Sequence, residues 1–220
     1  MEHTIFIDIE TIPTQSPSAI AAIRDGIRPP GSIKKPESIA AWKIENGDAA
    51  ALEATAKTSF DPAQGHICTI GWAIDDGDVM TASINDDLLS EPDILSKFFY
   101  TIDAHHHHEF VGHYISGFDL RFILCRAVVL GVKIPRSIPR DPKPWGGQVF
   151  DTMTAWAGTK GTISLDNLCA ALGIPGKDSF SGADVAAAWA NGEHEKIAEY
   201  CRDDVERVRS IWRKFQAAGW

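Results

Sequence analysis

The stretch M-E-H-T-I-F-I-D-I-E, residues 1–10, decides the fold of this 220-residue chain. Its segment Ile5-Phe6-Ile7 is β-branched and aromatic, which predicts a strand. Because alternate side chains of a strand point to opposite faces, Asp8 and Glu10 share one face and the isoleucines share the other. Two neighbouring carboxylates repel each other and are costly to bury alone, so a divalent cation commonly holds such pairs. A solvated strand end is the alternative, and the pair alone does not decide between the two.

The composition is that of a globular protein, with 44% hydrophobic and 23% charged residues and a net charge of −9. No apolar run reaches the length of about 18 residues that a membrane span needs, and the N-terminus does not resemble a signal peptide. The four cysteines are scattered in apolar sequence without a C-x-x-C pair, so we expect reduced thiols. These features predict a cytoplasmic protein with no membrane partner.

Strand and helix patterns alternate along most of the chain, which predicts a single α/β domain over residues 1–220. We expect strands at Ile67–Ile74 and Val79–Ile84 (a hairpin), Phe110–Gly112 and Val149–Thr152, and helices at Ile94–Ile102, Phe118–Leu130, Leu165–Leu172, Ala183–Ala190 and Glu193–Phe215. Residues 11–65 break this pattern, and we expect them to form an insertion over the site that could act as a lid.

Two charged or metal-binding clusters remain open to more than one interpretation. The segment from Arg121 to Lys143 contains six basic residues against the single acid Asp141, which fits either a contact with a phosphate backbone or a solvated helix face and loop. The net charge argues against broad attraction to nucleic acid but does not exclude a locally positive site. The run His105–His108 favours a solvated loop over a metal site, because consecutive side chains diverge in both helix and strand.

Two further carboxylates occupy positions that need an explanation. Asp204 falls in the apolar stripe of the last predicted helix, so it must be ion-paired, protonated or bound to metal. Tyr200 precedes it by one turn on the same face. Asp119 follows the Gly-rich stretch 112–117 and opens a predicted helix, where the helix dipole alone would favour an acid.

Taken together, these residues resemble the three motifs of DEDD-superfamily exonucleases, in the branch that carries tyrosine. The motifs are Asp8-Ile9-Glu10, Phe118-Asp119 and Tyr200-x-x-x-Asp204. The surrounding sequence, notably 65–72, 164–177 and 197–205, is most similar to predicted 3′–5′ exonucleases related to the proofreading domain of B-family DNA polymerases. This resemblance implies an α/β, ribonuclease-H-like (DnaQ-like exonuclease) fold with a central mixed β-sheet flanked by helices. It also implies release of nucleotides from a free 3′ end.

The resemblance further implies a site for two Mg²⁺ or Mn²⁺ ions, which suit hard oxygen ligands. Asp8 would bridge the two ions, and Glu10 and Asp204 would complete the site of the ion that activates water. Asp119 would hold the second ion, partly through water. Tyr200 would orient the attacking water through its hydroxyl group rather than act as a strong base, because its reference pKa is about 10.

Substrate contacts follow less directly from the sequence. The family usually has an asparagine five residues before the aspartate of the second motif, and here Tyr114 occupies that position. Phe6, Tyr114 and Phe118 are candidates for stacking on terminal bases, with core packing as the alternative for each. Arg121 is a further candidate contact at the start of the basic segment.

The expected substrate is single-stranded DNA or a DNA 3′ end. An RNA-processing exonuclease of the same superfamily is the first alternative, because the carboxylates and the tyrosine do not read the 2′-OH. A catalytically silent nucleic-acid-binding domain is the second, and a metal-dependent hydrolase of small phosphoesters is the third. No polymerase domain is recognised in the sequence, so we expect any polymerase or repair partner to act in trans.

Overall fold

The computed structural model describes residues 3–84, 89–104, 108–141, 143, 146–176 and 180–220. It contains two compact units, of which the larger comprises residues 1–10 and 67–220 and the smaller residues 11–66. The run His105–His107 lies outside the described residues, so the interpretation of the histidine cluster stays a prediction.

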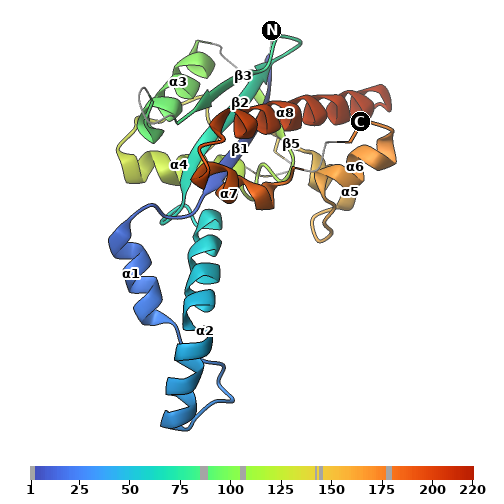
Figure 1. Ribbon diagram of the computed structural model, residues 1–220. Helices are drawn as coiled ribbons and strands as arrows, with labels where there is room; N and C mark the ends of the chain where they lie inside the picture. The colour runs from blue at the N-terminus through green and yellow to red at the C-terminus, as the bar shows by residue number, and fades with distance from the viewer. Residues whose placement is uncertain (1–2, 85–88, 105–107, 142, 144–145, 177–179) are drawn as a thin grey trace. The chain divides into compact units, whose positions relative to one another are not determined.

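A five-stranded mixed β-sheet forms the centre of the larger unit (Figure 1). Its order is β3-β2-β1-β4-β5, with bounds β1 (His3–Ile12), β2 (His66–Ile74), β3 (Met80–Ser83), β4 (His108–Gly112) and β5 (Val149–Asp151). Strand β4 pairs in parallel with both β1 and β5, whereas β2 and β3 form the antiparallel hairpin that the sequence predicts. The stretch that carries Asp8 and Glu10 therefore forms the central strand, β1.

The helices of the larger unit lie where the hydrophobic pattern predicts them, except for the short helix α5, which the sequence did not predict. They are α3 (Glu91–Asp103), α4 (Asp119–Leu130), α5 (Thr152–Ala157), α6 (Leu165–Leu172), α7 (Val185–Ala190) and α8 (His194–Ala217), with a 3₁₀ turn η2 (Gly182–Asp184) before α7. Helix α6 shows why the prediction works, since the Ser164 hydroxyl accepts the amide of Asn167 at its start. Gly173 ends it with φ of 67°, a left-handed conformation that glycine adopts without strain. None of the helices in the described part of the chain is long and apolar enough to cross a bilayer.

Both faces of β1 are covered, and the two faces carry different side chains. Ile5, Ile7 and Ile9 belong to the larger core, which α3 and α4 complete on one side of the sheet (Figure 1). Phe6 lies in a second core on the opposite face, with Val205 of α8. The alternation predicted from the sequence is thus confirmed, and it directs Asp8 and Glu10 toward the face that α8 covers.

A buried ion pair joins three elements of the larger unit. Glu91 Oε1 accepts hydrogen bonds from Arg126 Nε at 2.7 Å and from the amide of Ile67 at 2.9 Å, and Arg126 Nη2 lies 2.7 Å from Glu91 Oε2. Arg126 is 3% exposed. It therefore cannot belong to a basic surface for phosphates, and the structure corrects that part of the interpretation of 121–143.

The smaller unit is a helical hairpin. It contains α1 (Pro17–Gly26), α2 (Pro36–Ala56) and a 3₁₀ turn η1 (Lys57–Phe60), and Arg24 of α1 pairs with Asp48 of α2. The amide of Thr14 donates to Thr58 Oγ1 at 2.9 Å, which ties the start of the unit to its end. Helix α1 buries no side chain and α2 buries Ala51, so this unit has little core of its own. Its role as a lid stays a prediction.

Candidate active site

The structure brings together the carboxylates of all three sequence motifs. Asp8 and Glu10 follow one another on the same face of β1, and their oxygens lie within 4.8 Å of each other and of Cys201 Sγ on α8. Asp119 reaches the same strand, because its Oδ1 accepts the amide of Ile9 at 3.2 Å. Asp204 of α8 contributes charge to the same cluster.

Each element positions its acid for a local reason. Strand β1 alternates apolar and acidic side chains, α4 begins at Asp119, and α8 turns the face of Cys201 and Asp204 toward the sheet. Gly71 of β2 allows this close approach, since a Cβ there would come within 2.9 Å of Cys201 Sγ. The site is therefore built where α8 packs directly on β1 and β2.

Burial makes this cluster electrostatically unfavourable when all its members are ionised. The pKa of Asp8 is raised well above its ordinary value, first by burial and then by the negative charges of Glu10, Asp204 and Asp119. Burial also raises the pKa of Asp119, to about 7. Among the described residues, Asp8 Oδ2 is buried without a hydrogen-bond partner.

These features fit a divalent cation. Carboxylate oxygens are the hard donors that such ions prefer, and a cation would satisfy Asp8 Oδ2 and offset the repulsion among the acids. Cys201 is the exception in this group, because burial and the neighbouring acids raise the pKa of its thiol and its Sγ donates to the carbonyl of Asp8. The geometry therefore defines a candidate carboxylate metal site.

Tyr200 lies in the same electrostatic environment one turn before Asp204. Its pKa is raised first by burial and then by Asp204, Glu10 and Asp8, which favours the protonated, neutral hydroxyl group. Phe180 packs against its ring at a centroid distance of 5.0 Å. A neutral, positioned hydroxyl group can orient a water molecule but cannot serve as a general base.

Asp204 also takes part in an ion pair. Arg207 Nη1 lies 2.8 Å from Asp204 Oδ1, and both side chains are at most 9% exposed. The ion pair considered from the sequence is therefore present, in addition to the proximity of Asp204 to the other acids. A guanidinium at this position holds the orientation of the Asp204 carboxylate.

The four candidate substrate contacts lie in different environments. Phe6 is 1% exposed and packs edge-to-face on Trp212, so core packing describes it and the expectation that it stacks on a base is corrected. Phe118 is half-buried against Phe122. Arg121 is exposed, with Asp141 3.8 Å away.

Tyr114, the departure from the usual asparagine, is the most unusual of these residues. It is 49% exposed and has φ of 62°, a left-handed conformation in which asparagine is common but a bulky side chain is an outlier. Its amide donates to Asp151 Oδ1 at 3.1 Å, and its carbonyl accepts the amides of Gly117 and Phe118 at 3.0 and 2.9 Å.

Sequence reasoning missed Asp151, which organises the loop before Asp119. This carboxylate is 1% exposed and accepts the amides of Tyr114 and Ser116, the Ser116 hydroxyl at 2.5 Å, and the amides of Met153 and Thr154. The signal available was weak, an aspartate at the end of a short strand just before a helix, which is typical of an ordinary N-cap.

This α/β fold, with acids converging from β1, α4 and α8 at one face of a mixed sheet, is that of a ribonuclease-H-like exonuclease domain. The chain belongs to the family described as predicted 3′–5′ exonucleases related to the exonuclease domain of PolB, whose model matches residues 63–218. The match includes Asp119, Tyr200 and Asp204, whereas Asp8 and Glu10 precede it.

The likeness to a solved structure extends over almost the whole chain and so is not limited to the residues that the family model matches. The family B DNA polymerase from the hyperthermophilic archaeon Pyrobaculum calidifontis is similar with a TM-score of 0.62 and 14% identity, over 98% of this chain and 25% of the polymerase. At that identity the likeness shows the fold alone, and the chain spans a quarter of the length of that protein. No curated protein matches the sequence.

Proposed function

We propose that the protein is a two-metal 3′–5′ exonuclease that hydrolyses phosphodiester bonds at the 3′ end of single-stranded DNA, with Mg²⁺ or Mn²⁺ as cofactor. The observation that carries the proposal is the convergence of Asp8, Glu10, Asp119 and Asp204, with Asp8 Oδ2 buried and unpartnered among the described residues. Membership of the exonuclease family supports the reaction class.

The residues of the chain divide the work in the following way. Asp8 would bridge two ions, Glu10 and Asp204 would bind the first, and Asp119 would bind the second. When bound, such ions supply the charge that activates water and stabilises the leaving oxygen. Tyr200 would orient the attacking water through its neutral hydroxyl group, and Arg207 would hold the Asp204 carboxylate in place.

Hydrolysis of a labelled strand tests the proposal directly. A 5′-labelled single-stranded DNA oligonucleotide is incubated with the wild type, Asp8→Ala and Asp203→Ala, in Mg²⁺, in Mn²⁺ and in EDTA. Asp203 is the matched control, because it is an exposed acid adjacent to Asp204 on α8. We expect a ladder that shortens from the 3′ end in either metal with the wild type and Asp203→Ala, and no ladder with Asp8→Ala or in EDTA.

Near-normal turnover by Asp8→Ala would contradict the two-metal assignment. An oligoribonucleotide of the same sequence, run in parallel, addresses the RNA alternative, since the four acids do not distinguish the sugars. Metal-dependent thermal stabilisation without hydrolysis of either strand would favour the silent binding domain. A polymerase or repair partner acting in trans stays a proposal that this assay does not address.

A further inference from the structure

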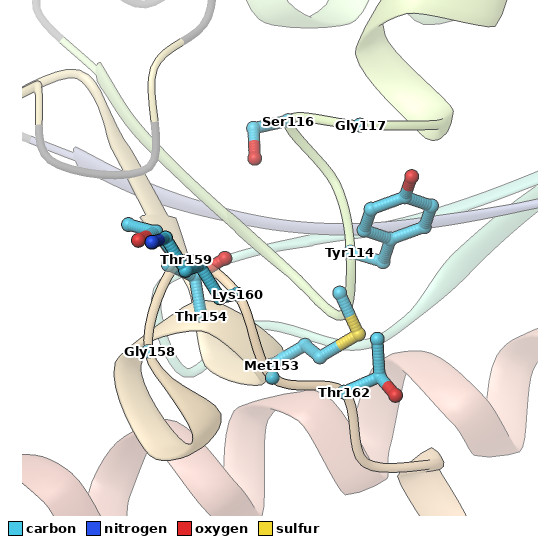
Figure 2. A pocket seen from close by; sticks show the side chains of 10 residues that line it. Tyr114, Ser116, Gly117, Met153, Thr154, Gly158, Thr159, Lys160 and Thr162 are labelled. Atoms are coloured by element: carbon cyan, nitrogen blue, oxygen red, sulfur yellow. The ribbon is translucent and has the colours of Figure 1, made fainter.

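A pocket of about 410 Å³ lies between the loop that precedes α4 and the loop that follows α5 (Figure 2). Tyr114, Ser116 and Gly117 line it from the first loop, and residues 158–162 line it from the second, with the first turn of α5 between them. Its volume is in the range of small-ligand sites, about 300–1,000 Å³. Tyr114 is five residues before Asp119, so the loop that forms one wall of the pocket continues into helix α4, which begins at Asp119.

The chemistry of this lining suits an anion. None of the ten lining residues is acidic, although the chain as a whole has a net charge of −9. Lys160 is exposed at the tip of the second loop and has no ion-pair partner within the described part of the chain. Threonine hydroxyls at 154, 159 and 162 and the glycine backbone at 158 and 161 add hydrogen-bonding groups of the kind that bind phosphates.

Tyr114 adds an aromatic surface to these anion-binding groups. Its ring lies directly over Gly117, because a Cβ on Gly117 would come within 2.2 Å of the ring atom Cε2. The backbone of Tyr114 is held in its left-handed conformation by hydrogen bonds to Asp151 and Gly117, although this conformation is unfavourable for tyrosine. The result is an exposed aromatic ring, packed over Gly117, at the edge of a pocket without acidic lining residues.

We infer that this pocket binds an internal nucleotide of the substrate strand, with the base stacked on Tyr114 and a phosphate against Lys160 and the threonine hydroxyls. The inference deepens the proposed function and rests on it, because the strand that enters the pocket is the one whose 3′ end reaches Asp119. It also accounts for the tyrosine, which would replace the usual asparagine contact by stacking on the strand.

Binding of a single strand tests the inference without hydrolysis. A 5′-fluorescein 12-nucleotide DNA is titrated in EDTA with the wild type, Tyr114→Gly, Tyr114→Phe and Lys160→Gln, and fluorescence anisotropy gives the Kd. Glycine is chosen because it tolerates φ of 62°. Tyr100→Ala and Lys97→Gln are the matched controls, since both residues are exposed on α3 outside the pocket, and circular dichroism verifies the fold of every variant.

We expect Tyr114→Gly to weaken binding about 5- to 150-fold, the range for loss of one base stack, and Tyr114→Phe to bind within about twofold of the wild type. Lys160→Gln should reduce the slope of log Kd against log salt by about 0.7, the value for one phosphate contact on a single strand. With DNA that has an abasic nucleotide at the stacked position, Tyr114→Gly should bind with the same Kd as the wild type, because the base that Tyr114 contacts is already absent. The comparison forms a double-mutant cycle.

Equal binding by Tyr114→Gly and Tyr100→Ala, or an unchanged salt slope in Lys160→Gln, would overturn the inference. Complete displacement of the labelled DNA by a free mononucleotide, at concentrations near the Kd of that mononucleotide, would also overturn the inference. The pocket would then bind the product of the reaction and not an internal nucleotide. Failure of the proposed function is distinguishable: Tyr114-dependent binding with no ladder in Mg²⁺ or Mn²⁺ refutes the exonuclease and supports the pocket. A normal ladder together with binding that does not depend on Tyr114 supports the exonuclease and refutes the pocket.

Discussion

Replacing Asp119 by asparagine is expected to stabilise the metal-free protein at pH 8. Burial raises the pKa of this carboxyl group from 3.8 to about 7 in the folded state. Between these two values the folded state binds more protons than the unfolded state, so stability falls as pH rises through that window. A shift of about three pKa units corresponds to at most about 4 kcal/mol lost by pH 8, at about 1.4 kcal/mol per unit.

Asparagine removes this loss and keeps the contact of Asp119 with strand β1. Its side-chain oxygen still accepts the amide of Ile9, so the variant should fold in the same way. In EDTA, the unfolding free energy of the wild type should fall between pH 5 and pH 8, and Asp8 adds a contribution of the same sign. The variant should show a shallower decline and exceed the wild type at pH 8 by up to about 4 kcal/mol.

Urea denaturation at pH 5 and pH 8 measures both quantities. Asp203→Asn is the control, because an exposed acid should change stability by less than about 0.5 kcal/mol. Millimolar Mg²⁺ or Mn²⁺ should then raise the wild-type midpoint at pH 8 and raise that of Asp119→Asn much less, since one ligand is lost. A wild type whose stability does not change between pH 5 and 8, or a variant that is less stable at pH 8, would refute the electrostatic reasoning.

Three further changes have definite expected outcomes. Glu91→Gln leaves the Arg126 guanidinium buried without its counter-charge and should cost about 3–5 kcal/mol in urea denaturation, whereas a loss below about 1 kcal/mol would mean that the pair is solvated. Tyr200→Phe should keep the melting temperature and lower kcat about 10- to 100-fold, so unfolding instead would make the hydroxyl structural. Gly117→Ala should displace the Tyr114 ring and weaken strand binding in the anisotropy titration, with little change in circular dichroism.

The sequence predicted the elements well where local chemistry marks them. Period-two alternation in β1 separates the isoleucines from Asp8 and Glu10, and Ser164 and Gly173 mark both ends of α6. Asp204 could be recognised as a buried acid because it interrupts an apolar stripe. Each of these signals lies within one helix or one strand, where sequence spacing determines geometry.

Contacts between distant residues could not be predicted from spacing. The bond from Ile9 to Asp119 joins residues 110 positions apart, and only the family resemblance implied that Asp119 lies near Asp8 and Glu10. Arg126 looks like one of several surface cations until Glu91, 35 residues earlier, is seen beside it. Phe6 could be placed on a face of β1 but not assigned to a base or to the core, because the helix that covers it lies at the other end of the chain.

Asp151 gives the loop before α4 and the start of α5 a common anchor. One carboxylate accepts the amides of Tyr114 and Ser116 and also those of Met153 and Thr154, so the loop before α4 is tied to the first turn of α5, which lines the pocket beside it. A strand bound in the site that we infer would meet a wall that is already ordered, and less conformational entropy would be lost on binding than with free loops. A residue that never touches the strand would thereby help to set how tightly it is held.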